Sequence, residues 1–286
     1  MRKIINKIRE IIPLSLRIKT GPFIAYIVYF FNVYIRKARI PHILSIEETA
    51  DMIKKNNLSA IRFGDGEMSI MDGISIPFQD YSEDLAKKLK FILQRNHDGL
   101  LICIPNFFGK MSIYVKEGFL FNIHHMFKHG YLWRKLLSPT QIYGNTFVSR
   151  PYIYLKDKSH SENTFKKLKS IWADKEVVII EGEKSKNGIG NDLFDNMKSL
   201  ERIPCPNENA YLKYNEIKNR VLKISKDKLI LIALGPTTKI LAYDLFLLGY
   251  RVIDIGHLDL EYEMLRRGEK NAHQMRLVHI DIKAKY

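Results

Sequence analysis

Carboxylates and glycines are interleaved in the motif Arg62-Phe-Gly-Asp65-Gly-Glu67, which lies at the end of a short apolar run. The glycines on either side of Asp65 leave the backbone open to close approach by a ligand. If the motif forms an extended turn, Asp65 and Glu67 reach the same side of it. Paired carboxylates suit Mg²⁺ or Mn²⁺, which prefer oxygen ligands and often bridge to substrate phosphates. The alternative is an ordinary solvated turn closed by Asp and Gly.

A second acidic cluster follows the last apolar run, in Gly256-His257-Leu-Asp259-Leu-Glu261-Tyr-Glu263. If the chain stays extended, His257, Asp259 and Glu261 share one face, and an imidazole with two carboxylates forms a credible Mn²⁺ site. If a helix begins at Asp259, that residue becomes its N-cap and Glu263 faces another direction. Glu263 is our first candidate for a general base, and Asp65 is the second.

Two further segments are suited to binding phosphate. The turn Gly235-Pro236-Thr237-Thr238 joins a strand pattern to a helix pattern, so free backbone N–H groups and the positive end of a helix dipole would face an anion. The segment 184–192 contributes a cation, a hydroxyl, two glycines and an amide. Together these motifs give the candidate donor-binding residues Arg62, Lys184, Ser185, Asn191, Asp192, Gly235, Pro236, Thr237 and Thr238.

Several other chemistries lack their motifs. The segment 184–192 has no GK[ST] sequence, and Leu193 replaces the third glycine of a dinucleotide fingerprint, which disfavours kinases and dehydrogenases. The chain has no GxSxG elbow, and neither Cys103 nor Cys205 lies beside a histidine, so covalent hydrolysis has no local support. Both cysteines lie in apolar segments, where a thiol behaves as a small hydrophobe in a reducing cytosol.

The elements that must position these motifs alternate between helix and strand from about residue 45, which indicates an α/β fold with a doubly wound, mostly parallel sheet. The predicted strands are Ala60–Phe63, Leu100–Ile104, Val177–Glu181, Ile203–Cys205, Leu229–Leu234 and Arg251–Ile255. The predicted helices are Ile46–Lys55, Ser82–Arg95, Ser161–Trp172, Asn209–Ile224, Thr238–Leu248 and Glu261–Arg267. Ligands bind outside the carboxyl ends of such strands, so the motifs should meet at one edge. The aromatic-rich segment Phe107–Lys156 is predicted to be a helical insertion or lid, with simple core packing as the alternative.

Positive charge is concentrated at the N-terminus. The 286 residues contain 46 Lys and Arg against 31 Asp and Glu, a formal charge of +15. We assign residues 1–44 to a basic, apolar extension and residues 45–286 to one domain. The apolar run Phe23–Ile35 is too short to span a bilayer, which takes about 20 residues. Isoleucines before it recur at helical spacing opposite basic residues, which fits either a helix on an anionic membrane or one packed on the domain. We expect a cytoplasmic protein, peripheral on the inner face of the plasma membrane in the first case.

At these motifs the sequence resembles the GT-D-fold glycosyltransferases of bacteria. The phrases that carry the resemblance are RFGDGE (62–67), VVIIEGEKSKNGIGNDLF (177–194), NENAYLKYNEI (207–217), LIALGPTTKILAYDL (231–245) and GYRVIDIGHLDLEYE (249–263). The resemblance implies a Rossmann-like sheet, a UDP-sugar donor, a divalent metal ion and a DxE signature. Asp65-Gly-Glu67 and Asp259-Leu-Glu261 both fit that signature. It also implies acceptors among bacterial surface glycans, glycolipids and glycoproteins.

The expected function is therefore metal-dependent, inverting sugar transfer. A metal-dependent phosphohydrolase or phosphotransferase would use the same carboxylates and phosphate loops. Nucleic-acid binding is the third possibility, but about half of the excess charge lies in the N-terminal segment and not across a groove-sized face. We therefore expect no nucleic-acid partner.

Overall fold

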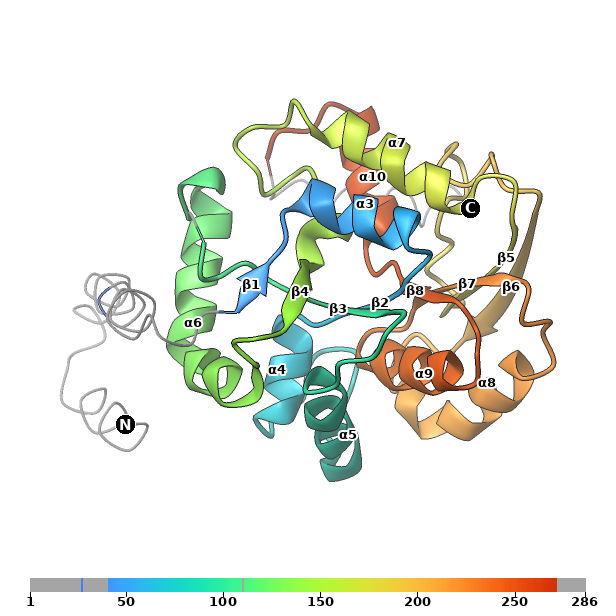
Figure 1. Ribbon diagram of the computed structural model, residues 1–286, viewed down its shortest axis with the longest axis horizontal. Coiled ribbons are helices and arrows are strands. Elements are labelled where there is room, and N and C mark those ends of the chain that lie inside the picture. The colour runs from blue at the N-terminus through green and yellow to red at the C-terminus, as the bar shows by residue number, and fades with distance from the viewer. Residues whose placement is uncertain (1–26, 28–40, 110, 272–286) are drawn as a thin grey trace.

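The computed structural model describes residue 27, residues 41–109 and residues 111–271 (Figure 1). The predicted membrane-binding or packed helix in the N-terminal extension lies outside these residues. No helix within the described ranges is long and apolar enough to cross a bilayer.

One eight-stranded sheet forms the centre of the fold, with the strand order β1-β4-β3-β2-β8-β7-β5-β6. All of its strand pairs are parallel, which confirms the predicted fold class. The strands are β1 His42–Ile43, β2 Ser59–Arg62, β3 Leu100–Ile104, β4 Ile142–Asn145, β5 Glu176–Gly182, β6 Ser199–Cys205, β7 Leu229–Ala233 and β8 Val252–Asp254. Strands β1 and β4 were not predicted. Strand β1 lies within the segment assigned to the extension, and β4 lies within the segment assigned to a helical insertion.

Helices cover both faces of the sheet (Figure 1). One face carries α3 Ile46–Lys55, α7 Ser161–Trp172 and α10 Leu258–Arg266. The other carries α4 Asp65–Met71, α5 Glu83–Leu93, α6 Lys116–Leu136, α8 Tyr214–Val221 and α9 Pro236–Leu247. Each face has its own buried apolar cluster, so the sheet separates two cores. This arrangement confirms the doubly wound topology.

Local sequence explains where the helices begin. Helix α3 starts at a reciprocal cap, in which the Ser45 hydroxyl accepts the Glu48 N–H at 3.1 Å and the Glu48 carboxylate accepts the Ser45 N–H at 2.8 Å. Helix α9 starts with Pro236 at its first position, where the missing N–H removes no helical hydrogen bond. Most of α9 is buried, because it packs against the sheet, α5 and α8.

The strand order of the sheet reverses between β2 and β8. Strands β2, β3 and β4 follow one another outward on one side, and β8 then pairs with β2 from the other side through Ala60 and Ile253. A reversal of this kind opens a crevice at the carboxyl ends of the two strands. The fold therefore directs a ligand to the ends of β2 and β8.

The predicted insertion contains the long helix α6 and contributes to both the core and the cavity. Its aromatic side chains pack closely, since the Phe107 and His125 rings stack at 4.7 Å and the Trp133 indole donates to His125 at 2.8 Å. Burial lowers the pKa of His125 to about 3, so this ring is neutral at physiological pH. Core packing thus accounts for these aromatic residues, while Phe121 of α6 extends to the cavity described below.

Candidate functional site

A cavity of about 570 Å³ lies at the carboxyl ends of β2, β8, β7 and β5. This is within the usual range for small-molecule sites, roughly 300–1,000 Å³. The turns after these strands line one part of the cavity. The rest is lined by α6, by residues that follow β3, β4 and β6, and by the loop 76–79 between α4 and α5. The cavity therefore occupies the crevice that the strand order predicts.

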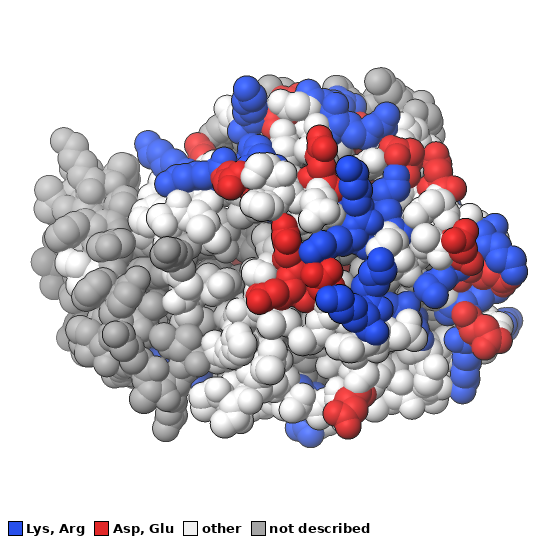
Figure 2. All heavy atoms as spheres, turned by 45° about the horizontal axis from the view of Figure 1, so that its top comes forward, with Lys and Arg blue, Asp and Glu red and all other residues white. Residues whose placement is uncertain are grey.

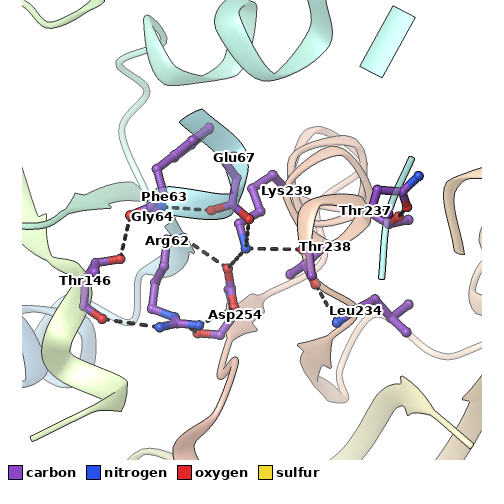
Figure 3. A network of polar contacts seen from close by, with 12 residues as sticks. Arg62, Phe63, Gly64, Glu67, Thr146, Leu234, Thr237, Thr238, Lys239 and Asp254 are labelled. Atoms are coloured by element: carbon purple, nitrogen blue, oxygen red, sulfur yellow. Dashed lines mark hydrogen bonds and ion pairs between the residues drawn. The ribbon is translucent and has the colours of Figure 1, made fainter. Parts of the chain in front are cut away.

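Four buried charged side chains form the base of the cavity (Figure 3). Arg62 at the end of β2 pairs with Asp254 at the end of β8, with 3.0 Å between guanidinium and carboxylate. Lys239 of α9 lies 3.0 Å from Asp254 and 2.9 Å from Glu67 of α4. Two cations thus face two carboxylates, and this network ties β2, β8, α4 and α9 together.

The network keeps its members charged despite their burial. Burial alone would raise the pKa of Asp254, but Arg62 and Lys239 hold that pKa below its usual value. Burial alone would lower the pKa of Lys239, but Asp254 and Glu67 outweigh burial and raise it. Because Asp254 and Lys239 are both ionised at neutral pH, their attraction offsets the cost of removing them from water.

The structure corrects the geometry predicted for Asp65 and Glu67. The segment is not an extended turn, because helix α4 begins at Asp65. Glu67 is buried, where one oxygen accepts the Gly64 N–H at 2.8 Å and the other pairs with Lys239. Asp65 is exposed and lines the cavity. Two residues apart on a helix, the two side chains point in different directions.

The second acidic cluster, residues 256–263, does not stay extended, because helix α10 begins at Leu258 with His257 as its N-cap. The helical alternative is therefore confirmed, with the cap two residues earlier than predicted. Asp259 accepts the Gly188 N–H at 2.9 Å and the Asn191 amide at 2.7 Å. The Glu261 carboxylate accepts two backbone N–H groups from residues 152 and 153 instead.

No three His, Cys, Asp or Glu side chains come together to form a metal site within residues 41–109 and 111–271. His257 and Asp259 line the cavity, but Glu261 does not. If a metal ion binds at this cavity, part of its coordination must therefore come from the substrate or from water.

The two candidate bases occupy different environments. Glu263 pairs with Arg266 at 3.1 Å and with Arg267 at 3.4 Å, and it does not line the cavity. Asp65 does line it. Asp259 is a third cavity carboxylate, and burial raises its pKa to about 6 even though Asn191 and Gly188 donate hydrogen bonds to it. A carboxylate with such a pKa can accept a proton near neutral pH.

The predicted donor-binding residues are only partly brought together. Arg62, Ser185 and Gly235 line the cavity. The remaining candidates do not line the cavity: Lys184, Asn191, Asp192, Pro236, Thr237 and Thr238. The Thr238 hydroxyl accepts the Leu234 N–H at 2.7 Å, and Asp192 pairs with Lys169 at 2.6 Å.

Two glycines bring the backbone close to the cavity floor. Gly256 has φ +46°, and a Cβ there would lie 1.7 Å from the Arg62 guanidinium. Gly235 has φ +53°, and a Cβ there would lie 2.7 Å from the Phe78 ring. Both positions combine a left-handed backbone with close contact, so glycine is required for two physical reasons.

Sequence reasoning missed several residues of the cavity. Lys239 and Asp254 belong to the buried network, and a charged side chain inside an otherwise apolar helix or strand is the signal that could have found them. Phe78, Asn187, Asn207 and Arg150 also line the cavity. Asn187 lies within the phosphate-binding segment 184–192, and Asn207 begins the phrase 207–217 that carries the family resemblance, so both had a local signal. No local pattern marks Phe78 or Arg150, which reach the cavity from loops that the chain brings together only in three dimensions.

Charges of both signs are interleaved on the face that carries α3, α7 and α10 (Figure 2). Lys167 of α7 pairs with Asp51 of α3 at 2.9 Å, and Arg266 of α10 pairs with Glu263 of the same helix at 3.1 Å. Such pairs near the surface contribute little to stability, typically about 0–1 kcal/mol each. On this face, the basic side chains are largely balanced by neighbouring acids.

Comparison with known proteins gives consistent matches. The sequence model of the family described as "Glycosyltransferase GT-D fold" matches residues 60–282. The chain is 42% identical over 232 residues to "Glycosyltransferase GlyD" of Streptococcus pneumoniae serotype 4. It is 41% identical over 238 residues to "Probable glycosyl transferase Gly" of Streptococcus gordonii. These alignments cover 81% and 83% of the chain but only 28% and 34% of the two relatives, so the chain spans about a third of their length.

Solved structures agree with the sequence matches. One, described as the highly conserved domain of unknown function 1792 with a distinct glycosyltransferase fold, superposes with a TM-score of 0.80 at 41% identity, covering 87% of each chain. Another, described as a new glycosyltransferase from Streptococcus sanguinis, gives a TM-score of 0.77 at 40% identity and covers 80% of this chain and 86% of that one. The likeness therefore extends over most of the chain.

Proposed function

The chain belongs to the glycosyltransferase GT-D fold family, and from this premise we propose that it transfers a sugar from a UDP-sugar to an acceptor hydroxyl with inversion at the anomeric carbon. The observation that carries the proposal is the cavity at the β2 and β8 ends, where the turns at Gly64, Gly235 and Gly256 expose backbone to a ligand. The expected acceptor is a surface glycan, glycolipid or glycoprotein.

The cavity has two sides that suit two substrates. The side built by the turns after β7, β5 and β6 offers Gly235, Ser185 and Asn207, together with the Phe78 ring from the loop between α4 and α5. Small residues and backbone N–H groups of this kind suit a nucleoside diphosphate. The side built after β3 and β4 is largely aromatic, and we assign it to the acceptor. The donor sugar would lie between them, above the buried ion network.

The charge of the cavity wall favours a divalent cation with the donor. Among the described residues, three cations line it against four carboxylates, a formal charge of −1 when all are ionised: Arg62, Arg150, Lys239, Asp65, Glu67, Asp254 and Asp259. A diphosphate adds further negative charge.

Asp65 is exposed, and its carboxylate has no hydrogen bond or ion pair within the described ranges. Mg²⁺ typically binds one or two carboxylates plus substrate phosphates, so Asp65 fits this role for Mg²⁺ or Mn²⁺.

The reaction is a direct displacement. The acceptor oxygen forms a bond to the anomeric carbon, the bond from that carbon to the diphosphate oxygen breaks, and UDP leaves with the electron pair. Asp259 accepts the hydroxyl proton, because it lines the cavity and Glu263 does not. A cation held at Asp65 would supply positive charge to the departing diphosphate. Arg62 and Lys239 hold the cavity floor in place through Asp254 and Glu67.

Turnover should fall on acidification, because the pKa of Asp259 is raised to about 6. Above this pH the carboxylate is ionised and can accept a proton, whereas below it the group is protonated and cannot. We expect kcat/KM to fall by about tenfold per pH unit below the pKa, measured from pH 8 to pH 5. The Asp259→Asn variant should have low activity without this acidic limb. A wild-type profile that is flat from pH 7 to pH 5 would exclude Asp259 as the base.

Nucleotide release from a panel of nucleotide sugars in the presence of Mn²⁺ tests the function directly. We expect UDP-sugars to be turned over, faster with an acceptor glycan than without one, and EDTA to stop the reaction. A metal-dependent phosphohydrolase would instead cleave the donor at the same rate without acceptor and would release phosphate. Turnover of phosphate esters in preference to UDP-sugars would overturn the proposal.

A further inference from the structure

Three cations line the cavity among the described residues, and the fold accounts for two of them. The Asp254 carboxylate pairs with Arg62, and the Glu67 and Asp254 carboxylates both pair with Lys239. The third cation, Arg150, has no carboxylate within ion-pair distance of its guanidinium in the described part of the chain. It is partly exposed. The cavity therefore presents one positive charge that no carboxylate of residues 41–109 or 111–271 contacts.

Arg150 approaches the cavity from the β4 side of the buried ion network. The segment that carries it follows β4 and reaches the end of β2, where Arg62 donates hydrogen bonds to the Thr146 carbonyl and the Ser149 hydroxyl. Strand β8 lies between β2 and β7, so the ends of β2 and β7 are two strand spacings apart, roughly 10 Å. Arg150 thus lines the cavity together with the residues after β3 and β4 that we assign to the acceptor.

Aromatic residues line this side of the cavity. The Tyr154 ring centre lies 5.9 Å from the Arg150 guanidinium, and the rings of Tyr154 and Phe147 meet edge to face at 6.4 Å. Phe107 and Phe121 continue the wall, and Phe121 is 45% exposed. Apolar ring faces with a few polar groups among them are typical of ligand sites and suit the C–H face of a sugar ring.

The nearest candidate for an internal partner is already engaged. Glu261 is close enough for Arg150 to lower its pKa against the larger opposing effect of burial. However, one Glu261 oxygen accepts the backbone N–H groups of Tyr152 and Ile153, and the other is buried without a hydrogen bond to any described residue. Glu261 thus fixes the loop that carries Arg150 and leaves the guanidinium available to a ligand.

We propose that Arg150 binds an anionic group of the acceptor, a phosphate or a carboxylate carried next to the sugar ring that packs against Tyr154 and Phe121. A guanidinium binds either group through two parallel hydrogen bonds, which also fixes its orientation. This inference rests on the proposed function, since it assumes that a donor occupies the opposite side.

The test measures binding of three small probes to the full chain with Mg²⁺ and saturating UDP, so that the donor side is filled. The probes are glucose 1-phosphate, glucuronic acid and the neutral methyl glucoside. We expect an anionic probe to bind at least about tenfold more tightly than the neutral one, since hydrogen bonds to charged groups are the strong ones. Arg150→Gln should abolish this difference, Arg150→Lys should retain part of it, and the control Lys156→Gln should leave it intact.

The results distinguish a contact between Arg150 and the acceptor from a contact between Arg150 and the donor. UDP affinity should change by less than about twofold in Arg150→Gln, because no donor contact is lost. A tenfold or greater loss of UDP affinity would assign Arg150 to the donor diphosphate and overturn the inference, as would equal binding of charged and neutral probes to the wild type. Comparing the phosphate with the carboxylate probe identifies which anion is preferred. Failure of the wild type to bind UDP at all would instead overturn the proposed function.

Discussion

Replacing Lys239 with methionine is expected to lower the free energy of unfolding by about 3–5 kcal/mol, the usual cost of removing one partner from a buried ion pair. Methionine fills a similar volume, so the loss would reflect charge more than packing. Glu67 would lose its only ion pair among the described residues, while Asp254 would keep Arg62. The measurement is urea unfolding followed by circular dichroism, with linear extrapolation to water.

Lys167→Met is the matched control, because Lys167 of α7 forms comparable pairs with Glu47 and Asp51 at the surface. We expect it to cost less than about 1 kcal/mol. Adding Glu67→Gln to Lys239→Met should restore part of the lost stability, since it removes the unpaired buried charge. A Lys239→Met variant as stable as the control would show that the network contributes nothing to folding.

Asp65→Asn should reduce kcat/KM by at least about 100-fold while leaving stability nearly unchanged. The side chain is exposed, so the substitution should alter the free energy of unfolding by less than about 1 kcal/mol. A cation at a reacting diphosphate stabilises the transition state by several kcal/mol, and about 1.4 kcal/mol corresponds to tenfold in rate. Because the amide is a weaker ligand, activity should recover in part at high Mn²⁺, which a Mn²⁺ titration of turnover would detect.

Asp98→Asn is the control for this experiment, since Asp98 is exposed on the loop before β3 and does not line the cavity. Glu67→Ala does not serve as a second probe of metal binding, because it would leave Lys239 with one carboxylate fewer and should destabilise the fold. Wild-type turnover by Asp65→Asn, with unchanged Mn²⁺ dependence, would remove Asp65 from the proposed site.

Much of the sheet could be predicted because buried parallel strands read as continuous apolar runs. The exceptions have physical causes. Strand β1 is two residues long, and β4 contains Gly144 and Asn145, which interrupt the apolar pattern. Gly144 is required by packing, because a Cβ there would lie 2.6 Å from the Cys103 sulfur. Such a requirement depends on the neighbouring strand and is invisible in the local sequence.

The position of the site could be predicted, but its geometry could not. The motif around Asp65 lies at the expected strand end, yet its glycines suggest a turn where the structure has a helix. Glu67 favours the helix by accepting the Gly64 N–H, and it also meets Lys239 from a distant segment. Whether a carboxylate faces a ligand or a buried lysine is decided by tertiary contacts.

The pairing of Arg62 with Asp254 joins residues separated by 192 positions. Closing so long a loop has a large entropic cost, and contacts of such sequence separation slow folding. Residues 41–156 build strands β1 to β4 on one side of the cavity, and residues 176–254 build strands β5 to β8 on the other. Neither portion can assemble the floor of the cavity alone. We therefore expect donor binding to emerge only in the last stage of folding, when both portions have docked, so that a partly folded chain cannot consume nucleotide sugar.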